Sequence, residues 1–200
     1  MGDQPKMFVG GTWVESESGK VFEATSPSTG EVIGAVPEGT RMDAQRAIAG
    51  ANVAWPEWAA LSAFDRARAM ERVAEVLDDR REDLARTLTL DQGKPLRAEA
   101  YGEVDELIQY FAMAVADARR MDGLMPPSVD ANKRVLLMRV PRGVVSIISP
   151  WNWPYTMPGE ILAPAIAYGS TVVWPPAPTT SICAARLMDC LEVADVPRAW

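Results

Sequence analysis

VVSIISPWNWPYTMPGEILAPAIAYGSTVVW, residues 144–174, is the stretch that decides the fold. It opens with residues 144–148, which are β-branched and nearly uncharged, as is typical of a strand buried on both faces of a parallel sheet. Residues 158–168 predict a helix, and residues 171–174 predict a second buried strand. A further helix is expected over residues 181–193. This order is the βαβ signature, so the final third of the chain predicts the beginning of a doubly wound α/β sheet.

The charged residues are distributed unevenly along the chain. Only seven of them lie from Pro141 onward, although the chain has 20 basic and 27 acidic residues, and nine of its 16 prolines share that stretch. We therefore expect charge-rich helices with exposed faces before Pro141, and interior strands and shaped turns after it. So apolar a final third is expected to be buried against further polypeptide.

Composition excludes several classes of protein. The formal net charge of −7 offers no basic surface for nucleic acid or anionic lipid, so neither is expected as a partner. The chain contains no histidine, which excludes His-dependent catalytic triads and His-ligated metal sites, and we expect no metal. Two cysteines are too few for a disulfide framework. No apolar run reaches the length of a membrane span and no signal peptide is recognised, so a cytoplasmic protein is expected.

Short antiparallel strands are predicted at the beginning of the chain. Residues 7–9 and 12–14 flank Gly10-Gly11, a turn pair typical of a hairpin. Residues 21–25 and 31–36 are expected to form two more strands around a Pro-Ser-Thr-Gly turn.

Helices are predicted from about Met42 onward. Pro56 predicts a break or kink in the first of them, and Ser62 is expected to cap the second. A third, from about Arg81, is expected to stop at Gly93. The apolar stripes of the second and fourth helices are Ala67, Met70, Val73, Ala74 and Leu77, and Val104, Leu107, Ile108, Phe111 and Val115. After these helices, residues 134–140 predict a strand.

Three polar or reactive side chains outside the strand ends are candidates for chemistry. Cys183 and Cys190 lie seven positions apart on a predicted helix, and we interpret them as inert core thiols. Lys94 follows a helix-stopping glycine, and we expect a solvated helix-end side chain there rather than a catalytic amine.

The concentrated signal is the segment Ile148–Pro154, ISPWNWP, where a predicted buried strand ends and a helix approaches. Ligands of open α/β sheets bind at the carboxyl ends of the strands. Two prolines and two tryptophans would hold the backbone rigid there, and Asn152 would present an amide donor of the kind that an oxyanion hole needs. The alternative is that Asn152 caps the helix and the tryptophans pack. On physical grounds alone the capping interpretation is favoured, because Asn is a preferred N-cap residue.

Several ordered motifs are similar to those of the aldehyde dehydrogenase superfamily. Residues 141–145 (PRGVV) and 148–154 resemble a family segment that usually ends Pro-Trp-Asn-Phe-Pro. Residues 163–174 resemble the family's Ala-Pro-Ala-Leu-Ala-Ala-Gly-Asn-Thr-Val-Val. Upstream, residues 26–32 and 91–95 also lie in family order. The resemblance covers essentially the whole chain.

The resemblance implies a fold, a division into domains and an activity. Residues 1–140 would form the N-terminal strands, the helical region and the start of an oligomerisation arm, and residues 141–200 the first part of a truncated, Rossmann-like dinucleotide-binding domain. The implied activity is the NAD- or NADP-dependent oxidation of an aldehyde to a carboxylic acid through a cysteine thiohemiacetal and thioester. A small aldehyde and, in a full-length form, further copies of the chain are the implied partners.

The resemblance also implies roles for individual residues. Asn152 matches the family's side-chain oxyanion donor, and Met157 falls where the family lines its substrate tunnel. The residues that match the cofactor-contacting positions are Ile148, Ser149, Pro150, Trp151, Pro176 and Ala177.

Two departures from the family pattern affect these expectations. Pro175 and Pro178 stand where the family usually has a Lys and a Glu that bond the adenosine ribose, so the choice between NAD and NADP stays open and weak cofactor binding is expected. The family's nucleophilic cysteine and general-base glutamate have no match in the 200 residues, so the chain alone is expected to be inactive. The alternatives are an inactive truncated fragment and a non-catalytic interaction module built on the arm near residues 134–140.

Overall fold

The parallel strand pair expected in the final third of the chain is present. The computed structural model describes residues 6–196. In it, β5 (Val144–Ser146) runs parallel to β6 (Thr171–Val173), and Val144 lies opposite Thr171. α5 (Thr156–Ala167) connects the two strands. The strand–helix–strand–helix order is thereby confirmed as the beginning of an α/β sheet.

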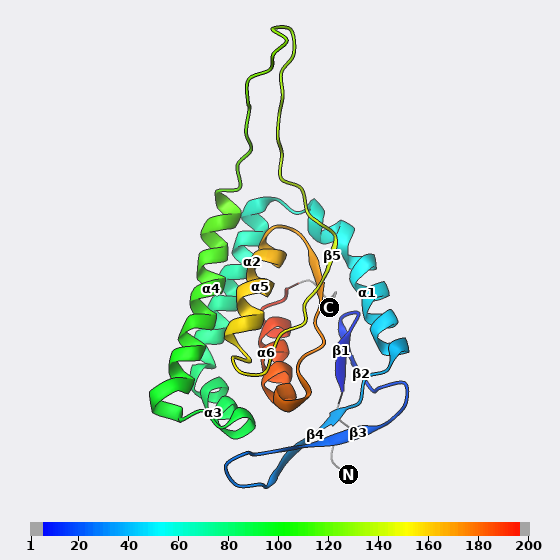
Figure 1. The fold of residues 1–200 in the computed structure, drawn as a ribbon, viewed down its shortest axis with the longest axis vertical. Coiled ribbons are helices and arrows are strands. Elements are labelled where there is room, and N and C mark those ends of the chain that lie inside the picture. Colours follow the sequence, from blue (N-terminus) through cyan, green and yellow to red (C-terminus); the bar gives the residue numbers. More distant parts are fainter. Residues whose placement is uncertain (1–5, 197–200) are drawn as a thin grey trace.

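The remaining elements surround this unit (Figure 1). Two antiparallel hairpins are formed by the first four strands, β1 (Met7–Val9) with β2 (Thr12–Val14) and β3 (Val21–Thr25) with β4 (Val32–Pro37). The other helices are α1 (Arg41–Ala60), α2 (Ala63–Asp79), α3 (Arg81–Gln92), the π-helical turn η1 (Leu96–Ala100), α4 (Tyr101–Arg119), the 3₁₀ turn η2 (Pro178–Thr180) and α6 (Ser181–Val193). Both predicted hairpins and the predicted order of helices are confirmed.

Local capping explains where the first helices begin. Thr40 and Asp43 form a reciprocal capping box at the start of α1, and the Ser62 hydroxyl accepts from the Asp65 N–H at the start of α2. Gly93 ends α3 at a φ of 89°, a left-handed conformation that a side chain would strain. The predicted boundaries at Ser62 and Gly93 are therefore correct.

Of the predicted break or kink at Pro56, the break does not occur, because α1 continues through this residue to Ala60, and the kink stays a prediction. Proline removes one backbone N–H donor from the helix. The following turn is nevertheless held by Trp58, which is buried and donates its indole N–H to the Ile166 carbonyl at 2.9 Å. This tertiary anchor outweighs the local cost of the proline.

The core lies where α4 packs against α2 and α5. The predicted stripes of α2 and α4 contribute Met70, Leu77 and Phe111, all fully buried. α5 approaches α4 closely at Gly159, where an added Cβ would lie 2.5 Å from the Leu107 Cδ1 atom. This approach brings the start of α5 next to the start of α4.

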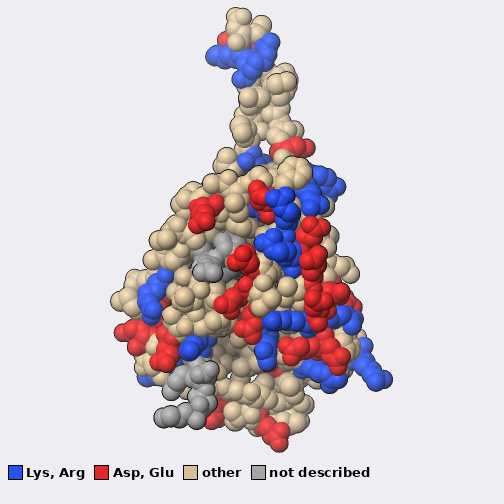
Figure 2. Space-filling model, turned by 180° about the vertical axis from the view of Figure 1, so that it is seen from behind, with Lys and Arg blue, Asp and Glu red and all other residues tan. Residues whose placement is uncertain are grey.

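The outer helical surface carries the charge, as expected. Figure 2 shows acidic and basic side chains interleaved over the face seen from behind. Exposed ion pairs include Glu82 with Arg86 on α3. None of the helices described between residues 6 and 196 is long and apolar enough to cross a membrane.

Two strand predictions are wrong. Residues 134–140 form no regular strand; they lie in a long arm that projects from the body (Figure 1), and its two halves pair only at the bridge between Leu124 and Leu137. An apolar sequence is not sufficient for a strand where no neighbouring strand pairs with it along its length. β5 is not buried on both faces, because Val144 and Val145 are half-buried and Ser146 is exposed. Within the described residues β5 pairs only with β6, which leaves its other edge open.

Candidate functional site

The candidate site lies at the edge of the sheet where β5 and β6 end. Parallel strands release their following loops at the same edge. The Trp174 indole N–H donates to the Ser149 hydroxyl at 3.0 Å, which ties the two loops together. The structure thus brings the segment Ile148–Trp151 to the loop that contains Pro176 and Ala177.

The expected cofactor-contacting residues differ in exposure. Ile148 is 83% exposed and Trp151 57% exposed, whereas Ser149 is buried beneath them. Pro176 and Ala177 are half-buried. The exposed members form an apolar edge that a flat ligand could cover, and the Ser149 hydroxyl holds that edge in place through Trp174.

Asn152 is exposed and does not cap α5. The N-cap residue of this helix is Tyr155, and no side chain of the helix's own segment caps it, so the capping interpretation of Asn152 is wrong. The Asn152 carbonyl accepts a hydrogen bond of 3.5 Å from the Gln92 side chain. Within residues 6–196 its side-chain amide has no hydrogen-bond partner, which leaves both N–H groups available to a ligand.

Met157 lies in the first turn of α5, directly after the Asn152 loop. It is half-buried, and its N–H donates to the Trp153 carbonyl at 3.1 Å. Asn152 and Met157 are therefore carried by one continuous turn.

Lys94 is buried, not solvated as the sequence led us to expect. Its side chain is 8% exposed, and its Nζ lies 2.5 Å from the Glu103 Oε2 atom and 3.3 Å from the centroid of the Trp153 ring. The π-helical turn η1 joins α3 to α4 and folds Glu103 back onto Lys94. The predicted helix-end setting did not anticipate this return of the chain.

Glu103 was missed by the sequence analysis, and it is the most connected side chain near the site. It is fully buried, and its second oxygen, Oε1, accepts from the Tyr155 N–H (2.8 Å) and the Thr156 N–H (3.3 Å) at the start of α5. A signal was present in the sequence, because Glu103 falls on the buried stripe of α4 between Ala100 and Leu107. A carboxylate on such a stripe needs a partner.

Asp91 plays a comparable part at the start of α6. It is buried, and its Oδ2 accepts from the Cys183 N–H at 2.8 Å. Burial raises the pKa of Asp91 above its ordinary value, and hydrogen bonds from Cys183 and Ile182 oppose this increase. Its place on the stripe of α3 with Leu84 and Leu88 gave the same kind of signal as Glu103.

The two cysteines are buried, as expected. Cys183 is fully buried and Cys190 is 1% exposed. Burial raises the pKa of the Cys183 thiol well above its usual range and that of Cys190 to about 11, so both are held as neutral thiols. Neither has the thiolate character of a nucleophile.

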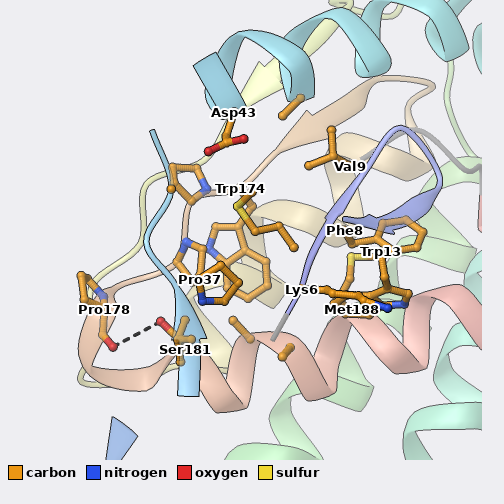
Figure 3. A pocket seen from close by; sticks show the side chains of 18 of the residues that line it. Lys6, Phe8, Val9, Trp13, Pro37, Asp43, Trp174, Pro178, Ser181 and Met188 are labelled. Carbon is orange, nitrogen blue, oxygen red and sulfur yellow. Dashed lines mark hydrogen bonds between the residues drawn. The ribbon is translucent and has the colours of Figure 1, made fainter. Parts of the chain in front are cut away.

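A cavity of 710 Å³ lies on the other side of the Trp174 loop, between the β1–β2 hairpin, the start of α1 and α6 (Figure 3). Its walls are mainly apolar and include Phe8, Trp174 and Met188. Pro176 lines it, but Asn152 does not. The cavity is thus separate from the exposed face of the Asn152 loop.

The loop after β6 fits a dinucleotide only through apolar contact. Pro175, Pro176, Ala177 and Pro178 carry no side-chain donor or acceptor for a ribose hydroxyl. Within residues 6–196, no three His, Cys, Asp or Glu side chains are grouped so as to hold a metal ion.

Comparison with known proteins relates this geometry to a family. The profile of the aldehyde dehydrogenase family matches residues 13–199. Glutarate-semialdehyde dehydrogenase of Pseudomonas aeruginosa is 37% identical over 191 residues, which are 96% of this chain and 39% of that protein. Succinate-semialdehyde dehydrogenase [NADP(+)] of Escherichia coli is 35% identical over 95% of this chain and 39% of its own length.

Solved structures agree in fold. A betaine aldehyde dehydrogenase variant from Staphylococcus aureus, in complex with NAD+, superposes with a TM-score of 0.92 at 33% identity, over 97% of this chain and 40% of that one. The chain spans about two fifths of the length of the relatives it matches. With the motif order, the parallel strand pair and the match over residues 13–199 in agreement, the chain belongs to the aldehyde dehydrogenase family.

Proposed function

We propose that these residues form the N-terminal portion of an NAD- or NADP-dependent aldehyde dehydrogenase, which oxidises an aldehyde to a carboxylic acid. The single observation that carries the proposal is the exposed side-chain amide of Asn152. Its side-chain amide is exposed at the carboxyl end of β5 and has no partner among the described residues, while the backbone around it is fixed. A fixed donor with free N–H groups is what stabilisation of an oxyanion requires.

The role of Asn152 follows from the chemistry of aldehyde oxidation through a thiol. When a cysteine thiolate adds to the aldehyde carbon, the carbonyl oxygen takes up the negative charge. The Asn152 Nδ2 donates to that oxygen and stabilises the charge as it develops. Neither Cys183 nor Cys190 supplies the thiolate, because both are buried and neutral; the thiolate and the base that activates water belong to the part of the family that this chain does not span.

The residues at the end of β5 are proposed to bind the cofactor. A bound nicotinamide cofactor supplies the hydride acceptor. The exposed side chains of Ile148, Pro150 and Trp151 would cover one face of the dinucleotide, held from behind by Ser149. Pro176 and Ala177 would contribute further apolar contact, and the loss of polar groups at Pro175 and Pro178 leaves the choice between NAD and NADP to other residues.

The substrate is proposed to be a small aldehyde, and Met157 is proposed to line its path. The relatives reported above are named for two semialdehydes and for betaine aldehyde, and each of these small aldehydes carries a charged group. We also propose, as the sequence predicts, that the protein is cytoplasmic.

A chimeric enzyme tests the role of Asn152. Residues 13–199 replace the matched segment of the Escherichia coli relative, and aldehyde-dependent cofactor reduction is measured. Asn152→Ala should lower kcat by about 10²–10³, as loss of one oxyanion donor does elsewhere. Asn52→Ala, which removes an exposed amide on α1, is the matched control and should not change kcat. Equal kcat values for the two variants would refute the assigned role.

The second candidate function is assembly without catalysis, and the arm favours it. The apolar side chains exposed along the arm are Leu124, Met125, Val129, Val135, Leu136, Leu137, Met138 and Val140. Figure 2 shows the arm as largely uncharged, with basic side chains near its tip. Light scattering of the chain alone tests this candidate, because an arm that assembles copies gives an oligomer, which Leu136→Asp should dissociate.

A further inference from the structure

The two helices that follow the parallel strands lack caps of their own. α5 begins at Thr156 and α6 at Ser181, and neither N-cap residue makes a side-chain hydrogen bond to its helix. The first N–H groups of any helix have no partner within the helix and need one from elsewhere. At α1 and α2 that partner is local, whereas here it comes from a different part of the chain.

At α5 the partner is Glu103 of α4. Its Oε1 accepts from the Tyr155 and Thr156 N–H groups at 2.8 and 3.3 Å, and its side chain is completely buried. A carboxylate in such surroundings is costly unless it is both hydrogen-bonded and paired. Lys94 supplies the counter-charge at 2.5 Å from Oε2.

The same lysine also contacts the loop directly. Its Nζ lies 3.3 Å from the centroid of the Trp153 ring, within the range of a cation–π interaction. Trp153 follows Asn152 immediately, and the Asn152 carbonyl accepts from Gln92. Residues 152, 153, 155 and 156 are therefore each held by a side chain from the segment 92–103.

The exposed amide of Asn152 depends on these contacts for its position. Its own side chain has no partner within the described residues, so only its backbone can fix it. We propose that Glu103 and Lys94 are positioning residues of this site, which hold the Asn152 turn in its donor geometry before an aldehyde arrives. The proposal rests on the proposed function for the importance of Asn152, although the contacts themselves do not.

A pair of double variants tests the positioning at constant charge. Lys94→Met with Glu103→Gln keeps an acceptor oxygen for α5, whereas Lys94→Met with Glu103→Met removes it, and neither leaves an unpaired buried charge. Amide hydrogen exchange of the 200-residue chain is followed by NMR at Tyr155 and Thr156, with Cys183 and Met70 as internal references. The variant without the acceptor should exchange about tenfold to a hundredfold faster at Tyr155 and Thr156 only. Equal exchange in the two variants, or acceleration at all four amides alike, would overturn the proposal.

The chimeric enzyme then tests whether the positioning acts through Asn152. Lys94→Met with Glu103→Met should lower kcat by about tenfold or more, with KM changed little, because misplacing a catalytic group chiefly affects the transition state. Combined with Asn152→Ala, it should cause no further loss, since the group it positions is already gone. Losses that multiply would refute positioning through Asn152. An Asn152→Ala variant with full activity would instead refute the proposed function and leave the exchange result to stand by itself.

Discussion

The first turns of α5 and α6 are both capped by a buried carboxylate, but only the carboxylate at α5 has a cationic partner. Each helix follows a short parallel strand and a proline-containing loop, and each is capped by a buried carboxylate from the segment 91–103. Glu103, at α5, has Lys94 beside it. Asp91, at α6, is held by hydrogen bonds from Cys183 and Ile182 without a cationic partner, and burial raises its pKa.

This difference shows what a lysine partner contributes to a buried carboxylate. Lys94 supplies the counter-charge for Glu103 in its fully buried position. Removal of either member therefore leaves the other buried without a partner. Asp91 depends on hydrogen bonds only, so its removal leaves no charge behind. The loop that carries Asn152 is thus held by the ion pair of Glu103 and Lys94, which is more sensitive to substitution than the hydrogen bonds of Asp91.

The largest expected effect is that of Lys94→Met. The substitution leaves Glu103 buried without a counter-charge, and the free energy of unfolding should fall by about 3–5 kcal/mol. Urea denaturation at pH 7 measures it. Adding Glu103→Gln should restore most of the loss, and a single variant no less stable than the double would contradict the ion-pair account.

Asp91→Ala should lower the free energy of unfolding by less, about 1–3 kcal/mol. It removes the acceptor of the hydrogen bonds from Cys183 and Ile182 and leaves these donors without a partner, but it strands no charge. The same denaturation experiment applies. A loss as large as that of Lys94→Met would mean that the two carboxylates do not differ as described.

A helix with a cap of its own provides the reference. Ser62→Ala at the start of α2 should lower the free energy of unfolding by about 1 kcal/mol, the usual value for loss of an N-cap. Amide exchange at Tyr155, Thr156 and Cys183 should not change relative to the rest of the chain. Selective acceleration at those amides would show that capping in α2 and in the site is coupled.

The smallest expected effect is a pH dependence specific to Asp91. Because its pKa is raised in the folded state, the folded chain binds this proton more tightly than the unfolded chain does. The cost of burying its charge is therefore absent below the ordinary pKa of 3.8 and increases as the pH rises through the raised value. Asp91→Asn lacks this cost, so its stability relative to the unsubstituted chain should improve as the pH rises through that window. Parallel stability curves for the two proteins would contradict the raised pKa.

Elements determined by nearby residues were predictable from the sequence. The hairpins, the cap at Ser62, the stop at Gly93 and the order of β5, α5, β6 and α6 all follow from spacing over a few positions. Ser62 and Gly93 act within one helical turn, which a periodic pattern can report.

Features determined by tertiary contact were not predictable in this way. α1 continues past Pro56 because Trp58 reaches Ile166, and residues 134–140 remain outside a sheet because only Leu137 finds a partner. Lys94 is buried because η1 returns the chain so that Glu103 covers it. In each case the decisive partner lies where local spacing gives no signal.

The structure brings the predicted site residues together at one edge of the sheet, and their roles stay predictions; the side chains that support this edge were not predicted. Asn152 lies at the exposed edge where the motif placed it, whereas the capping alternative failed because Tyr155 is the N-cap residue. Glu103 and Asp91 were overlooked as charged residues of helices. Their position on buried apolar stripes was the available signal.

The most direct test of the account compares amide exchange in two variants of the same chain. Asp91→Ala should accelerate exchange at Cys183 and leave Tyr155 and Thr156 unchanged relative to Met70. Lys94→Met with Glu103→Met should accelerate exchange at Tyr155 and Thr156 and leave Cys183 unchanged. This crossed pattern is the predicted result; acceleration of all three amides by either variant would contradict the claim that each carboxylate holds its own helix, and with it the assignment of Glu103 and Lys94 to the Asn152 turn.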